Sequence, residues 1–277
     1  MDVVIPAHNE ESVVGQAIRR WSAGPRRVRC VVVANGCADR TAQAARAAIG
    51  PGDVVLETST PGKANALNLG DESCTTFPRA YVDADVAIDA AGLLRLGEAL
   101  TESGALLAAP SLRLRTGEAS WLVRRYLSAW QQLPGVRDSS AGRGVYVLSA
   151  AGHARVFPLP ESLIADDGYV ARRIGAEERI ILPEVEVAVT PVRTIRAMIR
   201  RRIRVGAGNR QLAAMGLPPA TGAAGPGAVA KLVRTGAVRP LDAAVFVAVS
   251  LIVRALDLVR RVRGQSVSWG TDRGSVK

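Results

Sequence analysis

Cysteine and aromatic residues are scarce in this sequence of 277 residues. The three cysteines, Cys30, Cys37 and Cys74, show no CxxC spacing, so they indicate neither a disulfide framework nor a zinc site. We therefore expect a reducing, cytoplasmic location. Aromatic residues make up only 4% of the chain, which leaves few rings for stacking on nucleic-acid bases.

Two kinds of hydrophobic segment are also missing. No basic segment followed by an apolar core stands before the first apolar run, Asp2 to Pro6, so no secretory signal is visible. The apolar core of the last predicted helix, Ala243 to Val253, is shorter than the roughly 20 residues that span a bilayer. Asp242, Arg254 and Asp257 bound this core, so we expect no membrane-spanning helix.

The sequence is rich in apolar residues and in positive charge. With 48% hydrophobic and 22% charged residues, the chain is expected to fold as one large domain or as a domain with a C-terminal appendage. The net charge of +11 comes largely from arginine. Such a surface attracts phosphate, nucleic acid or an anionic membrane, and charge alone does not choose among them.

Short valine-rich runs alternate with stretches of helical periodicity in the first third of the chain. The runs are Val3 to Ile5, Cys30 to Ala34, Val54 to Leu56 and Arg79 to Val82. Continuous apolar strands are typical of a mostly parallel sheet that helices cover on both faces. Ligands of such sheets collect at the carboxyl ends of the strands, so the polar residues after each run become the candidates for a site.

A polar cluster accompanies each of these runs. Pro6 to Glu11 and Asn35 to Thr41 follow the first two runs, Gly62 to Asn68 opens a helix, and Asp83 and Asp85 close the fourth run. Two carboxylates at a strand end can share a divalent cation with diphosphate oxygens. The alternative is a pair of solvated turn aspartates, which the position after a buried strand disfavours.

Lys63 and Asp39 each allow a functional and a structural interpretation. Lys63 follows Gly62 at the start of a helix, where backbone amides and an ammonium group can meet a diphosphate or a carboxylate. Its alternative is a surface lysine. Asp39 stands where a loop turns into a helix, so it is either an N-cap or a carboxylate that contacts a nucleoside.

The second half of the chain loses the alternating pattern. A Gly/Ser-rich stretch from Ser139 to Gly144 precedes an acidic pair, Asp166 and Asp167, whose mutual repulsion is expected to raise one pKa. Further on, arginines are spaced so that they share one face of a helix expected over Thr194 to Arg204; they are Arg193, Arg196, Arg200 and Arg204. They form either a solvated cationic face or a clamp for diphosphate.

Together, the order of these motifs resembles the family 2 glycosyltransferases, whose fold is the single-domain GT-A fold. The resemblance runs from about residue 2 to about residue 212. It rests on Val3-Val4-Ile5-Pro6-Ala7-His8-Asn9-Glu10-Glu11, Asn35 to Thr41, Gly62 to Asn68, Asp83-Ala84-Asp85, Gly142-Arg143-Gly144-Val145-Tyr146 and Ala165-Asp166-Asp167. The expected fold is therefore α/β, with a mostly parallel central sheet flanked by helices and a C-terminal helical extension.

The resemblance also implies a reaction and a role for each matching residue. The reaction is the inverting transfer of a sugar from a nucleotide-diphosphate sugar to an acceptor hydroxyl, with a divalent cation, Mg²⁺ or Mn²⁺, as cofactor. Asp167 would be the general base and Asp166 its orienting neighbour, while Asp83 and Asp85 would bind the metal. The nucleotide-binding residues would be Pro6, Ala7, Glu10, Asn35, Asp39, Lys63, Asp83, Arg200 and Arg204, and Gly142, Arg143 and Gly144 would lie on the acceptor side.

Two departures from the family pattern narrow these expectations. Ala34 and Asn35 stand where acidic residues are common, so the resemblance specifies the nucleoside contacts of the second loop less closely than those of the other motifs. The QxxRW segment of processive synthases is missing from the region around Arg200 to Arg204, which favours an enzyme that transfers a single sugar.

The predicted catalytic domain covers residues 1–212, with a nucleotide-binding half of about 1–110 and an acceptor half of about 111–212. A Gly/Pro/Ala linker is expected over 213–227, a C-terminal amphipathic to apolar helical segment over 228–263 and a polar tail over 264–277. Three roles stay open for the segment 241–263: docking on the catalytic domain, homodimerisation, or peripheral association with the inner face of a membrane.

Two competing functions account for part of the pattern. A sugar-1-phosphate nucleotidyltransferase needs a glycine-rich phosphate loop after the first strand, and the segment from Pro6 to Glu11 contains no glycine. A basic nucleic-acid-binding protein explains the charge but leaves Asp83, Asp85 and Asp167 without a role. We expect a nucleotide-sugar donor and an acceptor of unknown class as partners, and no nucleic acid.

Overall fold

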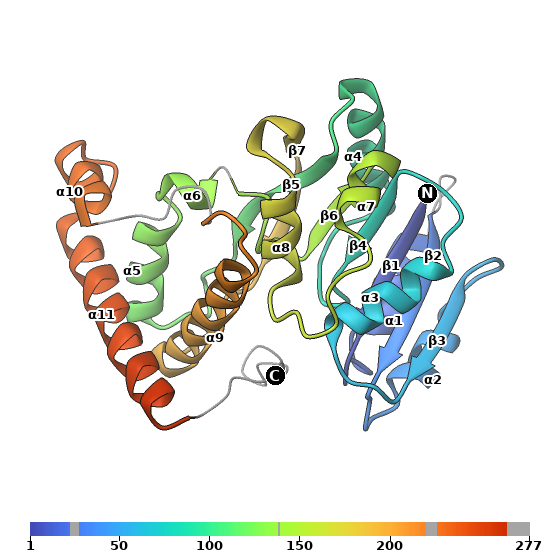
Figure 1. Ribbon diagram of the computed structural model, residues 1–277, viewed down its shortest axis with the longest axis horizontal. Helices are drawn as coiled ribbons and strands as arrows, with labels where there is room; N and C mark the ends of the chain where they lie inside the picture. The colour runs from blue at the N-terminus through green and yellow to red at the C-terminus, as the bar shows by residue number, and fades with distance from the viewer. Residues whose placement is uncertain (23–27, 138, 220–225, 265–277) are drawn as a thin grey trace. The chain divides into compact units, whose positions relative to one another are not determined.

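The computed structural model describes residues 1–22, 28–137, 139–219 and 226–264. The chain forms two compact units, each made of two chain segments (Figure 1). The first unit consists of Met1–Arg113 and Ser140–Val189, and the second of Leu114–Ser139 and Thr190–Lys277. The predicted linker over 213–227 and the predicted polar tail lie partly outside the described residues, at 220–225 and 265–277.

A mixed seven-stranded sheet with the order β3-β2-β1-β4-β6-β5-β7 forms the centre of the first unit. The strands are β1 (Asp2–Ala7), β2 (Arg29–Asn35), β3 (Val54–Thr58), β4 (Arg79–Val82), β5 (Leu107–Leu114), β6 (Val145–Leu148) and β7 (Arg179–Val189). Neighbouring strands among β1 to β4 run parallel, whereas β6 runs antiparallel to both β4 and β5. The strands β1 to β4 contain the four valine-rich runs, which confirms the prediction that these runs form strands.

Helices cover both faces of this sheet. They are α1 (Val14–Ser22), α2 (Thr41–Arg46), α3 (Lys63–Glu72), α4 (Ala90–Ser103), α7 (Ala150–Val156) and α8 (Asp166–Arg173), with the 3₁₀ helix η1 (Ala176–Glu178) before β7. Side chains of α1, α2 and α4 share one buried core with Val3, Ile5 and Val32 of the sheet. On the opposite face α3 packs against β1 and β2.

A glycine sets how closely α3 approaches the sheet. A Cβ atom added at Gly70 would lie 2.5 Å from Cγ1 of Val4 and 3.0 Å from Cγ2 of Val33, closer than van der Waals contact allows. The bare backbone of Gly70 therefore fixes the distance between α3 and the two central strands. Because α3 begins at Lys63, this packing also fixes the height of the lysine above the sheet.

The second unit is helical. Its helices are α5 (Trp121–Trp130), α6 (Pro134–Arg137), α9 (Ile195–Ala214), α10 (Pro226–Arg234) and α11 (Pro240–Val262). An apolar core that includes Val123, Met198 and Val249 joins α5, α9 and α11. The buried carboxylate of Asp242 accepts hydrogen bonds from Arg125 and Ser128, both 3.0 Å long, and so links α11 to α5.

Several sequence-based boundaries change in this unit. The helix expected over Thr194 to Arg204 continues to Ala214, with Thr194 as its N-cap, because the apolar face extends through the buried Leu212. The C-terminal segment expected to be helical over 228–263 contains two helices, α10 and α11, and starts slightly earlier than expected, at Pro226. Helices α5 and α9, which lie within the predicted catalytic domain of residues 1–212, belong to the same unit as α10 and α11. The two units therefore divide the chain differently from the predicted domains. The boundary of the predicted catalytic domain stays a prediction.

Within the described ranges, no helix is both long enough and apolar enough to cross a membrane.

Candidate functional site

The loops after β1 and β2 are joined to each other at the carboxyl edge of the sheet. The Glu10 amide donates to Oγ1 of Thr41 over 2.7 Å, and the Glu11 amide donates to Oδ2 of Asp39 over 3.2 Å. The other carboxylate oxygen of Asp39 accepts from the Thr41 amide at 3.0 Å. Asp39 therefore organises both loops and the start of α2, and its nucleoside contact stays a prediction.

Asn35, the last residue of β2, connects the sheet edge to the start of α3. Its side chain is fully buried, and its Oδ1 accepts from the Gly62 amide at 3.0 Å. Its Nδ2 finds no hydrogen-bond partner among the residues that the structure describes. Asn35 thus holds the turn from which Lys63 projects.

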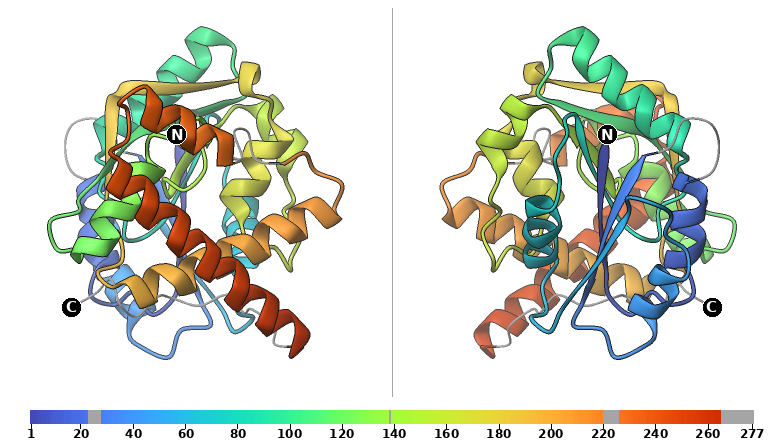
Figure 2. Two further views of the ribbon diagram at one scale, coloured as in Figure 1. Left: turned by 90° about the vertical axis from the view of Figure 1, so that its left-hand side faces the viewer. Right: turned by 90° about the vertical axis from the view of Figure 1, so that its right-hand side faces the viewer.

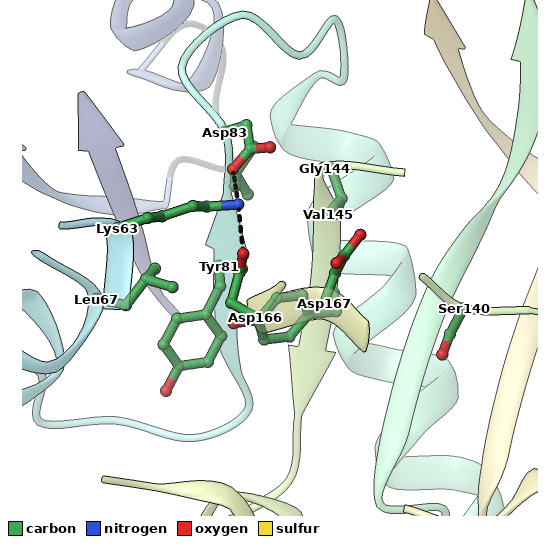
Figure 3. Close-up of a pocket in the computed structure, with 11 residues that line it drawn as sticks. Lys63, Leu67, Tyr81, Asp83, Ser140, Gly144, Val145, Asp166 and Asp167 are labelled. Carbon is green, nitrogen blue, oxygen red and sulfur yellow. Dashed lines mark ion pairs between the residues drawn. The ribbon is translucent and has the colours of Figure 1, made fainter. Parts of the chain in front are cut away.

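Lys63 lies between two carboxylates that come from distant parts of the sequence. Its ammonium is 2.7 Å from Oδ1 of Asp83 at the end of β4, and 3.0 Å from Oδ1 of Asp166 at the start of α8 (Figure 3). Burial acts to lower the pKa of Lys63, but the carboxylates of Asp166 and Asp83 outweigh burial and raise it. The lysine is therefore a permanent cation that crosslinks two edges of the pocket.

Asp166 is buried beneath this lysine. Burial, opposed by Lys63 and assisted by the neighbouring charges of Asp167 and Asp83, raises the pKa of Asp166 to about 6. Its second oxygen and the hydroxyl of Tyr146 are both buried, and neither has a hydrogen-bond partner within the described part of the chain. Both residues line the pocket, so two unsatisfied polar atoms lie buried in its wall.

Asp167, the next residue, has a different environment. It is half-buried, and its two carboxylate oxygens accept hydrogen bonds from backbone amides, Oδ2 from Gly142 and Oδ1 from Gly168. The first of these contacts ties α8 to the Gly/Ser-rich loop before β6. Of the acidic pair, Asp166 is thus bound to Lys63, and Asp167 is held by backbone at the rim of the same pocket.

Gly144 makes the approach between this loop and β4 feasible. Its φ is +66°, and a Cβ atom there would lie 2.6 Å from Cγ2 of Val86 and 3.1 Å from Oδ2 of Asp83. Its carbonyl accepts from the Asp83 amide at 2.8 Å. Arg143, in contrast, is buried and donates to the carbonyl of Pro110, so its guanidinium points into the protein.

A surplus of carboxylates lies beside the pocket. Burial raises the pKa of Glu10 to about 7, and the negative charges of Asp85, Asp83 and Asp39 add to the effect. Asp85 itself is exposed. Across the described ranges no three His, Cys, Asp or Glu side chains form a complete metal site. Asp83 and Asp85 nevertheless offer the oxygen donors that Mg²⁺ and Mn²⁺ take, and these cations commonly complete their shell with water and phosphate oxygens.

Two tyrosines of the pocket were not identified as a pair from the sequence. Tyr81 of β4 and Tyr146 of β6 are register partners, and their rings stack at 5.0 Å. Tyr81 also donates to Asp71 over 2.6 Å, and the other carboxylate oxygen of Asp71 is 2.7 Å from Nε2 of His153. Because side chains two residues apart in a strand lie on the same face, the sequence places Tyr81 on the same face as Asp83. Tyr146 comes against Tyr81 only through the pairing of β4 with β6.

The remaining predicted site residues are spread over both units. Pro6 and Ala7 are buried in β1, close to the end of the strand. Arg200 and Arg204 lie on α9, in the helical unit. The structure therefore brings Lys63, Asp83, Gly144, Asp166 and Asp167 together in one pocket, with Ser140 also in its lining. The roles of all the predicted site residues stay predictions.

Comparison with known proteins adds family and fold information. Residues 2–156 match the family model described as glycosyl transferase family 2. No curated protein sequence matches the chain. Glucosyl-3-phosphoglycerate synthase from Mycobacterium tuberculosis, solved with Mn²⁺ and UDP-glucose, is similar in structure, with a TM-score of 0.56, 22% identity and coverage of 78% of this chain and 79% of that chain. TarS 1–349 from S. aureus has a TM-score of 0.50 and 14% identity, and the match covers 74% of this chain and 63% of that chain.

Proposed function

Because the chain belongs to glycosyl transferase family 2 and has the GT-A fold, we propose that it transfers a sugar from a nucleoside-diphosphate sugar to an acceptor hydroxyl with inversion. The observation that carries the proposal is the pocket in which Lys63 joins Asp83 to Asp166 while Asp167 stands at the rim. It combines a cation, a strand-end carboxylate and a separately held second carboxylate within one small volume.

The proposed donor site lies at the carboxyl ends of β1, β2 and β4. Glu10, Asn35 and Asp39 would contact the nucleoside, and the ammonium of Lys63 would meet the diphosphate. Arg200 and Arg204 of α9 are the proposed additional phosphate contacts, since guanidinium groups match phosphate oxygens. UDP-glucose is the first donor to test, because the M. tuberculosis synthase was solved with it.

A divalent cation fits the donor set at Asp83 and Asp85. Both side chains offer only oxygen, and burial and the neighbouring charge of Asp85 raise the pKa of Asp83, although Lys63 opposes them. A cation held by Asp83 and Asp85 would offset this repulsion and, once bound, would supply a counter-charge for the leaving diphosphate. The synthase structures solved with UDP contain Mn²⁺ in one case and Mg²⁺ in another, which supports the same choice here.

Asp167 is the proposed general base. Two backbone amides orient its carboxylate without neutralising it, whereas the ammonium of Lys63 occupies one oxygen of Asp166. A base must receive the proton of the acceptor hydroxyl as the oxygen attacks the anomeric carbon from the face opposite the diphosphate. Asp166 would keep Lys63 and the start of α8 in position for that step.

Replacement of Asp167 by Asn tests the base. The Asp167→Asn variant is expected to bind the donor as the wild type does, while its turnover falls by roughly 10²-fold to 10⁴-fold. Isothermal titration with UDP and Mn²⁺ measures donor binding, and release of UDP from UDP-glucose in the presence of candidate acceptors measures turnover. Glu161→Gln, an equivalent exchange at an exposed residue before α8, serves as the control. Normal turnover in the Asp167→Asn variant would remove this residue from the mechanism.

A further inference from the structure

The outer face of α11 is apolar along almost the whole helix. Exposed residues recur at intervals of three and four; they are Leu241, Ala244, Ala248, Leu251, Ala255, Leu258 and Val262. Leu251 is 57% exposed, Leu258 53% and Val262 81%. At ~1.5 Å per residue the stripe is roughly 30 Å long. In the left view of Figure 2, α11 runs in front of α5 and α9, which cover its inner face.

The inner face of the helix accounts for its acidic residues. Asp242 is buried against Arg125, and Asp257 is buried against Arg210, whose two nitrogens lie 2.7 and 2.9 Å from the carboxylate. These are the two acids of residues 226–264. The outer face therefore displays no carboxylate within this segment.

The charges that do flank the stripe are positive. Arg254 is exposed beside it, Arg263 follows the helix, and Arg239 precedes it. Arg261 is exposed as well, with its Nε 3.5 Å from the carboxylate of Asp257. Lys231 and Arg234 add positive charge in the neighbouring helix α10. Within residues 226–264, the stripe is long and apolar and the charges that border it are cations, which is the pattern of a helix that lies in the interface of an anionic membrane.

A second copy of the chain fits this face less well. Pairing two such stripes would bring the arginines of one helix near those of the other, with no acidic partner from the same face. Lipid phosphates instead supply negative charge at the level where the arginines end, and acyl chains cover the leucines. Charge complementarity thus favours lipid over self-association.

We propose that α11 docks the protein on an anionic lipid surface, with the stripe from Leu241 to Val262 in the acyl boundary and the flanking arginines at the headgroups. This inference concerns where the protein acts, and it holds whether or not the proposed reaction is right. Lipid phosphates would also neutralise the excess positive charge of the helical unit, which the carboxylates of the pocket in the first unit do not.

Vesicle flotation of the full chain tests the docking. Binding is expected to vesicles of phosphatidylcholine mixed with phosphatidylglycerol, to be weak with phosphatidylcholine alone, and to decrease with added salt. The double variant Leu251→Gln with Leu258→Gln, and separately Arg254→Glu with Arg263→Glu, should each reduce binding about tenfold or more. Arg19→Glu with Arg115→Glu makes the same charge change at exposed positions elsewhere and should retain most of the binding.

Three results would overturn the proposal. They are equal binding to both kinds of vesicle, unchanged binding of the α11 variants, and a lipid-free dimer that Leu251→Gln with Leu258→Gln converts to a monomer in light scattering. Donor binding by the same variants, measured with UDP and Mn²⁺, separates loss of docking from loss of fold. It also distinguishes a failure of the docking proposal from a failure of the proposed reaction.

Discussion

The carboxyl group of Glu10 titrates near neutral pH, since burial and the nearby charges of Asp85, Asp83 and Asp39 raise its pKa to about 7. Its ordinary value is 4.5, so between these two values the folded protein binds more protons at this site than the unfolded chain. The contribution of Glu10 to stability is therefore present at low pH and is lost as the pH rises through this window.

Replacing Glu10 by Gln removes that titration. In metal-free urea unfolding at about pH 5 and about pH 8, the Glu10→Gln variant is expected to gain stability relative to the wild type as the pH rises. Glu11→Gln is the matched control, because Glu11 is exposed. Parallel pH dependence in all three proteins would show that Glu10 ionises as an ordinary glutamate.

The sequence predicts the residues of the donor edge better than those behind the pocket. Lys63 and Asp83 could be placed together because parallel strands end at one edge, and the motif order added Asp166 and Asp167. The contacts of Asp71 with Tyr81 and His153 could not be predicted. Asp71 and His153 are 82 residues apart in the sequence and share no motif, so only the folded sheet brings them together.

Helix α3 connects these two sets of contacts, with Lys63 at its first residue and Asp71 in its last turn. Gly70 permits the close packing that holds the helix, and Gly70→Ala is expected to lower the unfolding free energy by roughly 1–3 kcal/mol through overpacking. Chemical denaturation measures the loss.

Gly206→Ala provides the contrast for that prediction. This residue lies in the interior of α9, where an added Cβ atom would meet only the end of the Arg210 side chain, at 3.6 Å. Alanine there is expected to be neutral or to stabilise by about 0.5–1 kcal/mol, because glycine is a poor helix former. Equal effects of the two substitutions would contradict the packing argument for Gly70.

Among the elements, the parallel strands were easier to predict than β6. The valine-rich runs alternate with helical stretches, whereas Val145–Leu148 lies in the half of the sequence without this alternation, and its antiparallel direction depends on where the chain returns to the sheet. Between β5 and β6 the chain passes through the helical unit, at residues 114–139, before it joins the sheet again. The sequence of this segment shows helical periodicity but does not show which unit the helix joins, so the order of the last three strands could be known only from the fold.

For the molecule as a whole, ligand binding is expected to appear as stability. A ligand that binds only the folded state adds about 2.7 kcal/mol at a hundred times its Kd. UDP with Mn²⁺ should therefore raise the unfolding temperature of the wild type, and a chelator should abolish the shift. The shift should disappear in Asp85→Ala and persist in Asp89→Ala, since Asp89 caps α4 instead. A shift retained by Asp85→Ala would exclude this aspartate from the cation site.

The division into two units also limits what composition could predict. Net charge indicated an anionic partner for the whole chain, but the structure distributes the charges unequally. The pocket of the first unit is rich in carboxylates and contains Lys63 as its one cation among the described lining residues. The acids of α11 in the second unit are buried against arginines. The net charge of +11 therefore does not show that the pocket is rich in negative charge while the surface around α11 is positive.

The reversed direction of β6 has a consequence for how such a protein can diversify. Because β6 opposes β4, the loop that enters β6 at Gly142 to Gly144 meets the loop that leaves β4 at Asp83. One edge is therefore built from the exits of some strands and the entrance of another. Insertions ahead of β6 can therefore reshape the entrance of the site while the parallel registers of β1 to β4 stay unchanged.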